Sequence, residues 1–275
     1  MRKKAFGLSM ERTTTQKHWN MSAMHAHQDY ELYFLISGQR RYFLAHTIYD
    51  VAPGNAVFIP RNLLHRTVCL GGKGFDRYVI NFSQEHLDRF RTAAGRDVFA
   101  AYPRGACLQL PANGAWQIQK TFEEMEQELK HPDEWTQAAV SQGLYNILLT
   151  CLRIGKPKAP CQEETADKIQ QAAKYISEHY ADWLTLEDAA NLVHMEKTYF
   201  SKRFKALTGF GFLEYLTQTR LQAAQELLTA TEMSIGDISE ACGFSSSNYF
   251  GDVFRRCCGM SPSDYRLRSE AGESL

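Results

Sequence analysis

An internal repeat in the last hundred residues constrains the fold of this chain more than any other feature. Both copies contain an aromatic pair, then a Phe followed by a basic residue, then a glycine. The matching positions are Tyr199-Phe200, Phe204-Lys205 and Gly209 in the first copy, and Tyr249-Phe250, Phe254-Arg255 and Gly259 in the second. Upstream, Leu186 matches Ile235. Such self-similarity indicates two copies of one supersecondary unit.

Each copy predicts two helices joined by a short turn. The expected helices cover residues 186–192 and 197–207 in the first copy, and 235–241 and 247–257 in the second. Gly209 and Gly259 follow the second helices, where a glycine readily takes the left-handed conformation that ends a helix. Two helices joined by a turn of three or four residues form a helix-turn-helix. We therefore expect this motif twice, at about 185–209 and 234–259.

The second helix of each copy has one apolar face and one polar face. Helical spacing places Phe200, Phe204 and Leu207 on one side of the first, and Phe250, Val253 and Phe254 on one side of the second. The opposite sides carry cationic and hydrogen-bonding groups, which suit phosphates and base edges in a major groove. These candidate DNA-contacting residues are Lys197, Thr198, Ser201, Lys202, Lys205, Ser247, Asn248, Gly251, Asp252, Arg255 and Arg256.

Net charge by itself does not predict a nucleic-acid partner. The chain has 31 Lys and Arg against 31 Asp and Glu, and residues 165–275 carry 11 basic and 15 acidic side chains, net −4. The prediction depends instead on where the charges lie. Asp252 weakens it for the second copy, because phosphates repel a carboxylate; alternatively, Asp252 accepts a hydrogen bond from a cytosine amino group.

Residues 169–268 resemble the DNA-binding domain of AraC/XylS-type bacterial transcriptional regulators. The motifs are Tyr175-Ile176-x-x-His179-Tyr180, Leu186-x-x-Ala189-Ala190, Tyr215-Leu216-x-x-x-Arg220-Leu221 and Gly259-x-Ser261-Pro262-x-x-Tyr265-Arg266, beside the repeat itself. The resemblance implies seven helices, with a long helix at about 211–229 joining the two motifs. It also implies recognition helices that enter major-groove segments about one helical turn (~34 Å) apart.

The resemblance carries the DNA contacts residue by residue. They fall on Lys197, Thr198, Ser201 and Lys202, and then on Ser247, Asn248 and Asp252. The family often has a basic residue where Asp252 stands and Ser where Glu196 stands. Glu is a poorer N-cap than Ser, so we expect a weak cap at the start of the first recognition helix.

The first half of the chain predicts an antiparallel β-sandwich or barrel followed by two helices. Short segments rich in aromatic and β-branched residues occur at 30–38, 40–45, 47–51, 56–60, 64–70 and 75–82. Apolar residues at helical spacing predict amphipathic helices over 115–130 and 135–154. These helices either cover the barrel or form a subunit interface, and we favour a homodimer. Residues 155–164 are charged and contain prolines, which is typical of a linker.

Four polar residues in the β region form a candidate binding site. His25, His27, Glu31 and His65 offer the nitrogen and oxygen ligands that suit a transition metal. The same side chains would otherwise line a metal-free effector pocket or serve structural roles. Tyr33 shares a side with Glu31 in a strand. Arg41, Phe43 or their neighbours would complete the pocket, and the sequence does not say which face lies inside.

The motifs around these residues are similar to both signature motifs of the cupin fold. They read His25-x-His27-x-x-x-Glu31-x6-Gly38 and Gly54-x5-Pro60-x4-His65. The cupin metal positions fall on His25, His27, Glu31 and His65. Cupin sensor domains of AraC-type regulators look like this and bind a small effector, often a sugar.

We therefore expect a multidomain α and β chain: a cupin-like effector-binding domain (1–112), a helical dimerisation segment (113–155), a linker (156–165) and a DNA-binding domain (166–270). The expected function is transcriptional regulation, with double-stranded DNA and a small molecule as partners and RNA polymerase as a further candidate. No enzymatic activity and no required cofactor are expected. The absence of a signal peptide and of an apolar run of ~18–20 residues favours the cytoplasm.

Two alternatives remain open at this point. One is a metal-dependent cupin enzyme or metal sensor fused to a DNA-binding domain. The other is an interaction protein whose helical domain does not bind DNA.

Overall fold

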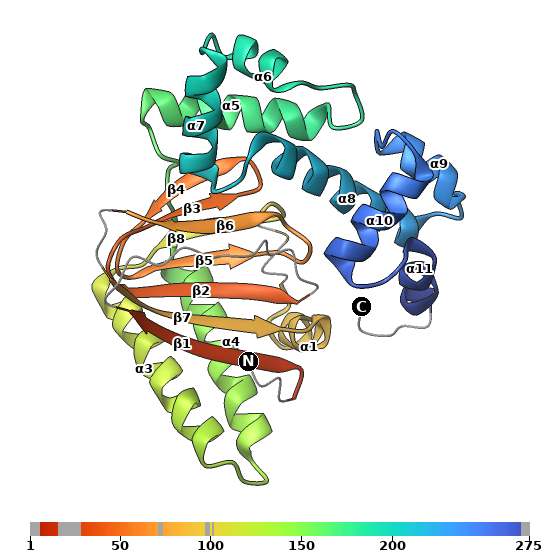
Figure 1. Cartoon of the computed structure of the whole chain (residues 1–275). Coiled ribbons are helices and arrows are strands. Elements are labelled where there is room, and N and C mark those ends of the chain that lie inside the picture. Colours follow the sequence, from red (N-terminus) through yellow and green to blue (C-terminus); the bar gives the residue numbers. More distant parts are fainter. Residues whose placement is uncertain (1–5, 16–28, 71–73, 97–99, 101, 271–275) are drawn as a thin grey trace. The chain divides into compact units, whose positions relative to one another are not determined.

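The computed structural model describes residues 6–15, 29–70, 74–96, 100 and 102–270 (Figure 1). The chain divides into two compact units, Met1–Cys161 and Gln162–Leu275. We call them the β-unit and the helical unit and describe each by itself. His25 and His27 lie outside the described residues. No described helix combines the length and apolar character that a membrane span requires.

The β-unit contains two antiparallel sheets. The larger has the order β1-β7-β2-β5-β8-β9 and the smaller β4-β3-β6. The strands are β1 (Leu8–Thr15), β2 (Tyr30–Ser37), β3 (Arg40–Leu44), β4 (Thr47–Val51), β5 (Asn55–Ile59), β6 (His65–Cys69), β7 (Phe75–Phe82), β8 (Ala106–Gln109) and β9 (Lys156–Pro157). All six expected strands form. Strands β1, β8 and β9 and helix α1 (Gln84–Ala94) were not predicted from the sequence.

The larger sheet is covered on both faces. Alternation along β2 directs Leu32 and Phe34 to a cluster shared with α1 and two later helices, whereas Tyr33 and Leu35 belong to the cluster inside the β-unit. The later helices are α3 (Ala112–Lys130) and α4 (Thr136–Ile154), close to the expected ranges. They pack tightly, because a Cβ on Gly143 would lie 2.6 Å from Met125 Cγ. One face of this helix pair therefore covers its own sheet. This is the first of the two alternatives that the sequence left open, covering the barrel or forming a subunit interface.

The segment expected to link the units is anchored to the β-unit over its first half. β9 pairs with β8, the Lys158 amide donates to the Cys107 carbonyl, and the Cys161 amide donates to the Ile48 carbonyl at 2.7 Å. The division between units therefore falls after Cys161, which is buried.

Residues 162–270 form seven helices (Figure 1). They are α5 (Glu164–Glu178), α6 (Leu186–Leu192), α7 (Lys197–Thr208), α8 (Phe212–Ala230), α9 (Ile235–Ala241), α10 (Ser247–Cys258) and α11 (Pro262–Glu270). Helices α6–α7 and α9–α10 are the two helix-turn-helix copies, and α8 joins them.

The two copies are built around the same aromatic triad. In the first, Phe200 and Phe204 have ring centroids 5.4 Å apart, and Tyr215 meets Phe204 edge-on at 5.6 Å. The second copy repeats this with Phe250, Phe254 and Tyr265, at 5.5 and 5.4 Å. Gly209 and Gly259 both take the left-handed conformation at the ends of α7 and α10. The repeat in the sequence is thus a repeat in packing.

Candidate nucleic-acid interface and effector site

Helix α7 presents a cationic surface built on a buried apolar face. Phe200, Phe204 and Leu207 are buried, as the helical spacing predicts. Of the five candidate DNA-contacting residues on α7, four are exposed and Ser201 is half-buried. The exposed residues are Lys197, Thr198, Lys202 and Lys205. The Lys197 ammonium lies 3.3 Å from the Glu187 carboxylate of α6. This ion pair is exposed to solvent and weak, so a DNA phosphate can compete with Glu187 for Lys197.

The expectation of a weak N-cap at Glu196 is wrong. Its carboxylate accepts from the amides of Thr198 and Tyr199, each at 2.8 Å. Two amide groups that would lack partners are thereby satisfied, and a negative charge sits at the positive end of the helix. The same backbone hydrogen bonds lower the pKa of Glu196. The Glu196 side chain is longer than that of Ser, so its two carboxylate oxygens reach both amide groups.

Helix α10 presents a polar surface that is less cationic. Ser246 caps it by accepting from the Tyr249 amide at 3.2 Å. Phe250, Val253 and Phe254 are buried. Most of the candidate DNA-contacting residues are exposed, and Gly251 is half-buried. The exposed residues are Ser247, Asn248, Asp252, Arg255 and Arg256. Asp252 lies mid-helix in this surface, and both arginines lie in the last turn.

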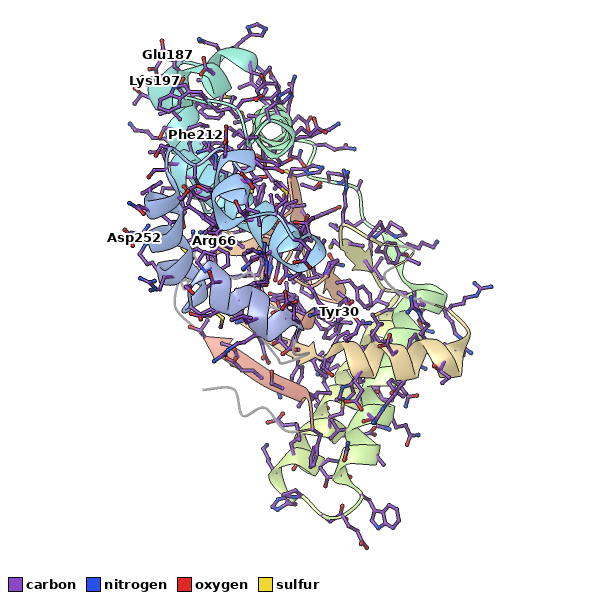
Figure 2. The ribbon with its side chains drawn as sticks, turned by 90° about the vertical axis from the view of Figure 1, so that its right-hand side faces the viewer. Tyr30, Arg66, Glu187, Lys197, Phe212 and Asp252 are labelled. Atoms are coloured by element: carbon purple, nitrogen blue, oxygen red, sulfur yellow. The ribbon has the colours of Figure 1, made fainter. Side chains whose placement is uncertain are left out.

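The two surfaces lie on the same side of the helical unit. Figure 2 shows Lys197 of α7 and Asp252 of α10 at the same edge of this unit. Because α8 connects the copies and packs against α7 and α9, one helix sets their relative placement. The helical unit can therefore offer both helices to one face of a duplex.

Two tyrosines escaped the sequence-based list of contact residues. Tyr199 and Tyr249, the third residues of α7 and α10, are 49% and 50% exposed. The repeat includes both positions, but the helical spacing gave them no role. Half-exposed phenols at the start of both recognition helices can donate hydrogen bonds to phosphate oxygens.

The β-unit holds a buried polar group around Glu31. The Tyr42 hydroxyl donates to Glu31 Oε1 at 3.3 Å, and Asn81 Nδ2 donates to Oε2 at 3.1 Å. His65 Nε2 lies 4.0 Å from Oε1. Burial keeps the pKa of Tyr42 well above its usual value, so the phenol remains a donor. Glu31 and His65, two of the four predicted ligands, are thus brought together.

The two predicted ligands that the structure describes offer one nitrogen and one carboxylate, ligand types that suit a transition metal. His65 Nδ1 lies 2.8 Å from the Leu63 carbonyl, which only accepts, so Nδ1 carries the proton. Nε2 then faces the Glu31 carboxylate with its lone pair. A histidine that donates one ring nitrogen to a carbonyl is oriented as metal-ligating histidines are.

A second buried polar group lies further along the same strands. Arg40 Nε donates to the Thr67 hydroxyl at 2.8 Å, and Nη1 donates to the Cys69 thiol at 2.7 Å. The Arg40 guanidinium lies over the Phe75 ring at 4.3 Å. The Arg77 guanidinium lies 5.5 Å from the Tyr33 ring centroid. Arg40 and Arg77 are functional candidates that the sequence analysis did not name.

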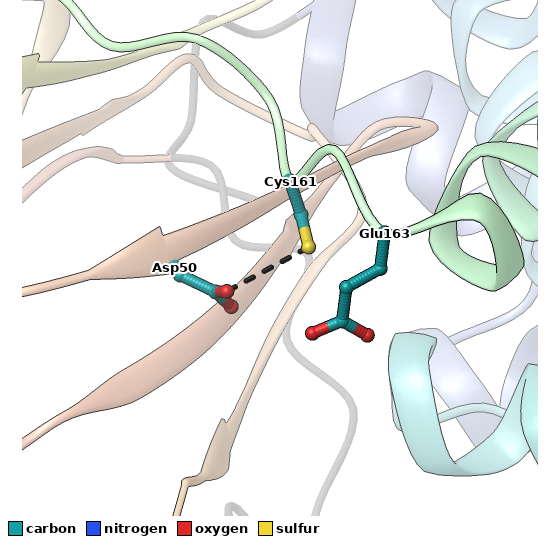
Figure 3. Close-up of side chains that lie close together, drawn as sticks. All are labelled: Asp50, Cys161 and Glu163. Atoms are coloured by element: carbon teal, nitrogen blue, oxygen red, sulfur yellow. Dashed lines mark hydrogen bonds between the residues drawn. The ribbon is translucent and has the colours of Figure 1, made fainter.

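Strand β3 presents Arg40 and Tyr42, the neighbours of Arg41 and Phe43, to the interior. Arg41 instead forms a two-point ion pair with Asp50 at 2.6 and 2.9 Å. The Cys161 thiol lies 3.6 Å from the same carboxylate (Figure 3). These contacts join β3 and β4 to the segment that leads into the helical unit.

Comparisons with known proteins agree with this division. A family described as "AraC-like ligand binding domain" matches residues 7–148, and one described as "Helix-turn-helix domain" matches 189–268. "HTH-type transcriptional activator RhaS" of Escherichia coli O81 is 27% identical over 258 residues, covering 88% of this chain and 86% of RhaS.

Two further matches cover the C-terminal part. "Regulatory protein PocR" of Salmonella typhimurium strain LT2 is 40% identical over 99 residues, covering 36% of this chain and 33% of PocR, so the match spans about a third of that relative's length. The crystal structure of the DNA-binding domain of AdpA with a target DNA is 31% identical, with a TM-score of 0.36, covering 37% of this chain and 92% of that one.

Proposed function

The chain belongs to the AraC family of transcriptional regulators, with an N-terminal AraC-like ligand-binding domain, and on this premise we propose that it is a ligand-responsive regulator of transcription. It binds double-stranded DNA through α7 and α10 and a small effector through the interior of the β-unit. The observation that carries the proposal is the repeated helix: two recognition helices with the same buried triad and exposed polar faces on one side of the helical unit.

The two helices divide the work of DNA binding. The α7 surface, with Lys197, Lys202 and Lys205, supplies the electrostatic attraction to phosphates that dominates non-specific affinity. Asn248 of α10 can form two hydrogen bonds with N6 and N7 of an adenine in the major groove, which favours base reading in the second copy. Contacts with RNA polymerase would follow once the protein is placed on DNA.

The effector acts on β3, whose side chains make contacts on both faces of the strand. Arg40 and Tyr42 of β3 face the interior, and Arg41 between them faces Asp50, which Cys161 also contacts. A ligand that shifts β3 therefore changes how the segment up to Cys161 is held. It moves the equilibrium only by the difference between its affinities for the two arrangements.

We further propose that the protein is a homodimer formed through α3 and α4. Their outer side carries a hollow lined by Trp116, Lys120, Leu149 and Ile154, among others, and Trp116 is 63% exposed. A dimer would bring four recognition helices to paired half-sites and raise affinity through effective concentration.

The decisive experiment is a band shift of the full-length protein on the DNA upstream of its own gene, repeated over a range of salt concentrations. Lys202→Glu should abolish binding at moderate salt, because it reverses a charge at the phosphates. Lys174→Glu, the same change at an exposed position on α5, should bind like the wild type. Equal binding by all three proteins would reject DNA recognition by α7 and favour the interaction-protein alternative.

A metal-dependent function is the second candidate, because His65 is oriented toward Glu31 as a ligand would be. Metal analysis of the purified protein tests it. One transition-metal ion per chain that is lost in His65→Ala and in His27→Ala would favour metal sensing or cupin chemistry. A metal-free wild type that still responds to an effector rejects it.

A further inference from the structure

We propose that the hollow on the outer side of α3 and α4 is a binding site for a small aromatic carboxylate. This site is separate from the interior of the β-unit, where the effector is proposed to bind. The inference therefore goes beyond the proposed function and gives the protein a second small-molecule ligand.

The hollow has the size of a ligand site. Helices α3 and α4 lie side by side (Figure 1), and residues at helical spacing on each of them line the hollow. Its volume is about 440 Å³. Sites for small molecules typically have volumes of about 300–1,000 Å³, so this hollow has room for a molecule with one or two rings.

The apolar part of the lining is supported by the core. Leu149 and Ile154 of α4 are half-buried and pack against the core cluster that α3 and α4 share with the sheet. Ile154 also lies against the backbone of α3, because a Cβ on Gly114 would collide with its Cδ1. Beside these two residues, Trp116 exposes most of its side chain. A flat ring that stacks on an exposed indole gains more than the burial of its area alone, so this lining favours an aromatic ligand.

The charged part of the lining has two cations and one carboxylate, net +1. The cations are Lys120 and Arg153, and the carboxylate belongs to Glu124. Lys120 lies 3.7 Å from Glu124 in an exposed and therefore weak ion pair, and its ammonium lies over the Trp116 ring at 5.4 Å from the centroid. The Arg153 guanidinium is exposed and forms no hydrogen bond or ion pair with any described residue.

A ring that carries one carboxylate matches both parts of the lining. The carboxylate would accept two hydrogen bonds from the Arg153 guanidinium and compete with Glu124 for Lys120. The ring would cover the Trp116 indole. A singly charged acid also balances the net charge of the lining better than a phosphate with two charges, which Glu124 would repel more strongly.

Ligand binding here would also affect the association of two copies. The homodimer proposed above uses the same outer side of α3 and α4, so a bound ligand and a second copy would compete for Trp116. The ligand would then shift the protein from dimer to monomer. This consequence rests on the proposed homodimer, whereas binding of the ligand does not.

A ligand-observed NMR titration of the full-length protein tests the site with indole-3-acetate, indole-3-acetamide and acetate. We expect saturable binding of indole-3-acetate, at least tenfold tighter than that of the neutral amide or of acetate. Arg153→Met should weaken binding of the acid about tenfold and remove its advantage over the amide. Trp116→Ala should weaken binding of the acid and of the amide by similar factors.

Two matched variants serve as controls. Arg104→Met and Trp135→Ala change the same residue types at exposed positions of the β-unit that do not line the hollow. Both should bind indole-3-acetate like the wild type. Because all four substituted side chains are exposed, each variant should unfold close to the Tm of the wild type.

Two results would overturn the proposal. The first is the absence of saturable binding of indole-3-acetate; if Trp116→Ala also dissociates a dimer, the hollow is covered by a second copy instead. The second is binding that is unchanged in both Arg153→Met and Trp116→Ala, which would place the ligand elsewhere. Sedimentation equilibrium distinguishes this test from that of the homodimer: a chain that is monomeric at every concentration, yet binds the acid through Arg153, keeps the ligand site and rejects the homodimer.

Discussion

The two helix-turn-helix copies are alike inside and different outside. Their aromatic triads have nearly the same ring spacings, 5.6 and 5.4 Å for the Phe–Tyr contacts, and both recognition helices end at a left-handed glycine. The exposed faces share few residues: α7 presents three lysines, and α10 presents Asn248, Asp252 and two arginines.

This difference distinguishes the residues that packing of the helical unit requires from the residues that DNA binding requires. A buried Phe that contacts several neighbours allows little substitution, because cavities and overpacking both destabilise a core. An exposed residue on the opposite side of the same helix has little effect on stability. The outer faces are therefore free to diverge, and we expect α7 to contribute mainly affinity and α10 mainly specificity.

The largest expected effect tests the likeness of the two cores. Phe204→Ala and Phe254→Ala should each lower the free energy of unfolding by about 3–5 kcal/mol, because both rings are fully buried. Denaturant unfolding measures this, with Lys205→Ala and Arg255→Ala as exposed controls expected within about 0.5 kcal/mol of the wild type. A large effect in one copy only would show that the triads are not equivalent.

The next effect tests the division of work on DNA. Lys202→Ala should weaken binding to every duplex and reduce the slope of log affinity against log salt by about 1, because one phosphate contact is lost. Asn248→Ala should leave that slope unchanged and cost about 1–3 kcal/mol on the cognate site alone. Salt titrations on cognate and unrelated duplexes distinguish the two. The reverse pattern would exchange the assigned roles.

Asp252 should give a smaller effect of opposite sign. Removing its charge with Asp252→Asn should raise affinity for cognate and unrelated DNA alike by about 2–5-fold, because an exposed carboxylate near phosphates is repelled. Asp167→Asn, the same change at an exposed position on α5, is the neutral control. If only cognate binding changes, and weakens, then Asp252 accepts a hydrogen bond from a cytosine.

The smallest effect contrasts the two helix caps. The pKa of Glu196 is lowered by its backbone hydrogen bonds, so its stabilisation is present above the unfolded-state pKa and lost as the pH falls through the folded-state value. The stability difference between the wild type and Glu196→Gln should therefore be largest near neutral pH and vanish in acid. Ser246→Ala in the second copy should show no such dependence on pH. If the stability difference between the wild type and Glu196→Gln is the same in acid as at neutral pH, the charge of Glu196 contributes nothing to stability.

Much of the helical unit was predictable from the sequence. Helix α6 and helix α9 have the expected bounds, and α7 and α10 extend one residue further. These helices are amphipathic, so apolar spacing reports which side is buried, and the duplication supplied an independent check. The missed elements in the β-unit had weaker signals: β1 is largely polar and β9 has only two residues.

The candidate effector site was predictable only in part. Glu31, Tyr33 and His65, which the motif pointed to as pocket residues, are all buried, and their role in effector binding stays a prediction. Arg40 and Arg77 were not named, since an arginine in a short strand is ordinarily taken as solvent-facing.

The repeat, its inward aromatic residues and its outward polar residues could be deduced from the order of amino acids alone, because a one-sided helix reveals its orientation through its spacing. Which side chains of β3 face the interior could not be deduced in this way. All five of its residues are buried, so no alternation of polarity distinguishes Arg40 and Tyr42 from Arg41 and Phe43. Only the pairing of β3 with β4 and β6 sets which face lies inside, because the side chain that finds Asp50 must point away from the one that finds Thr67.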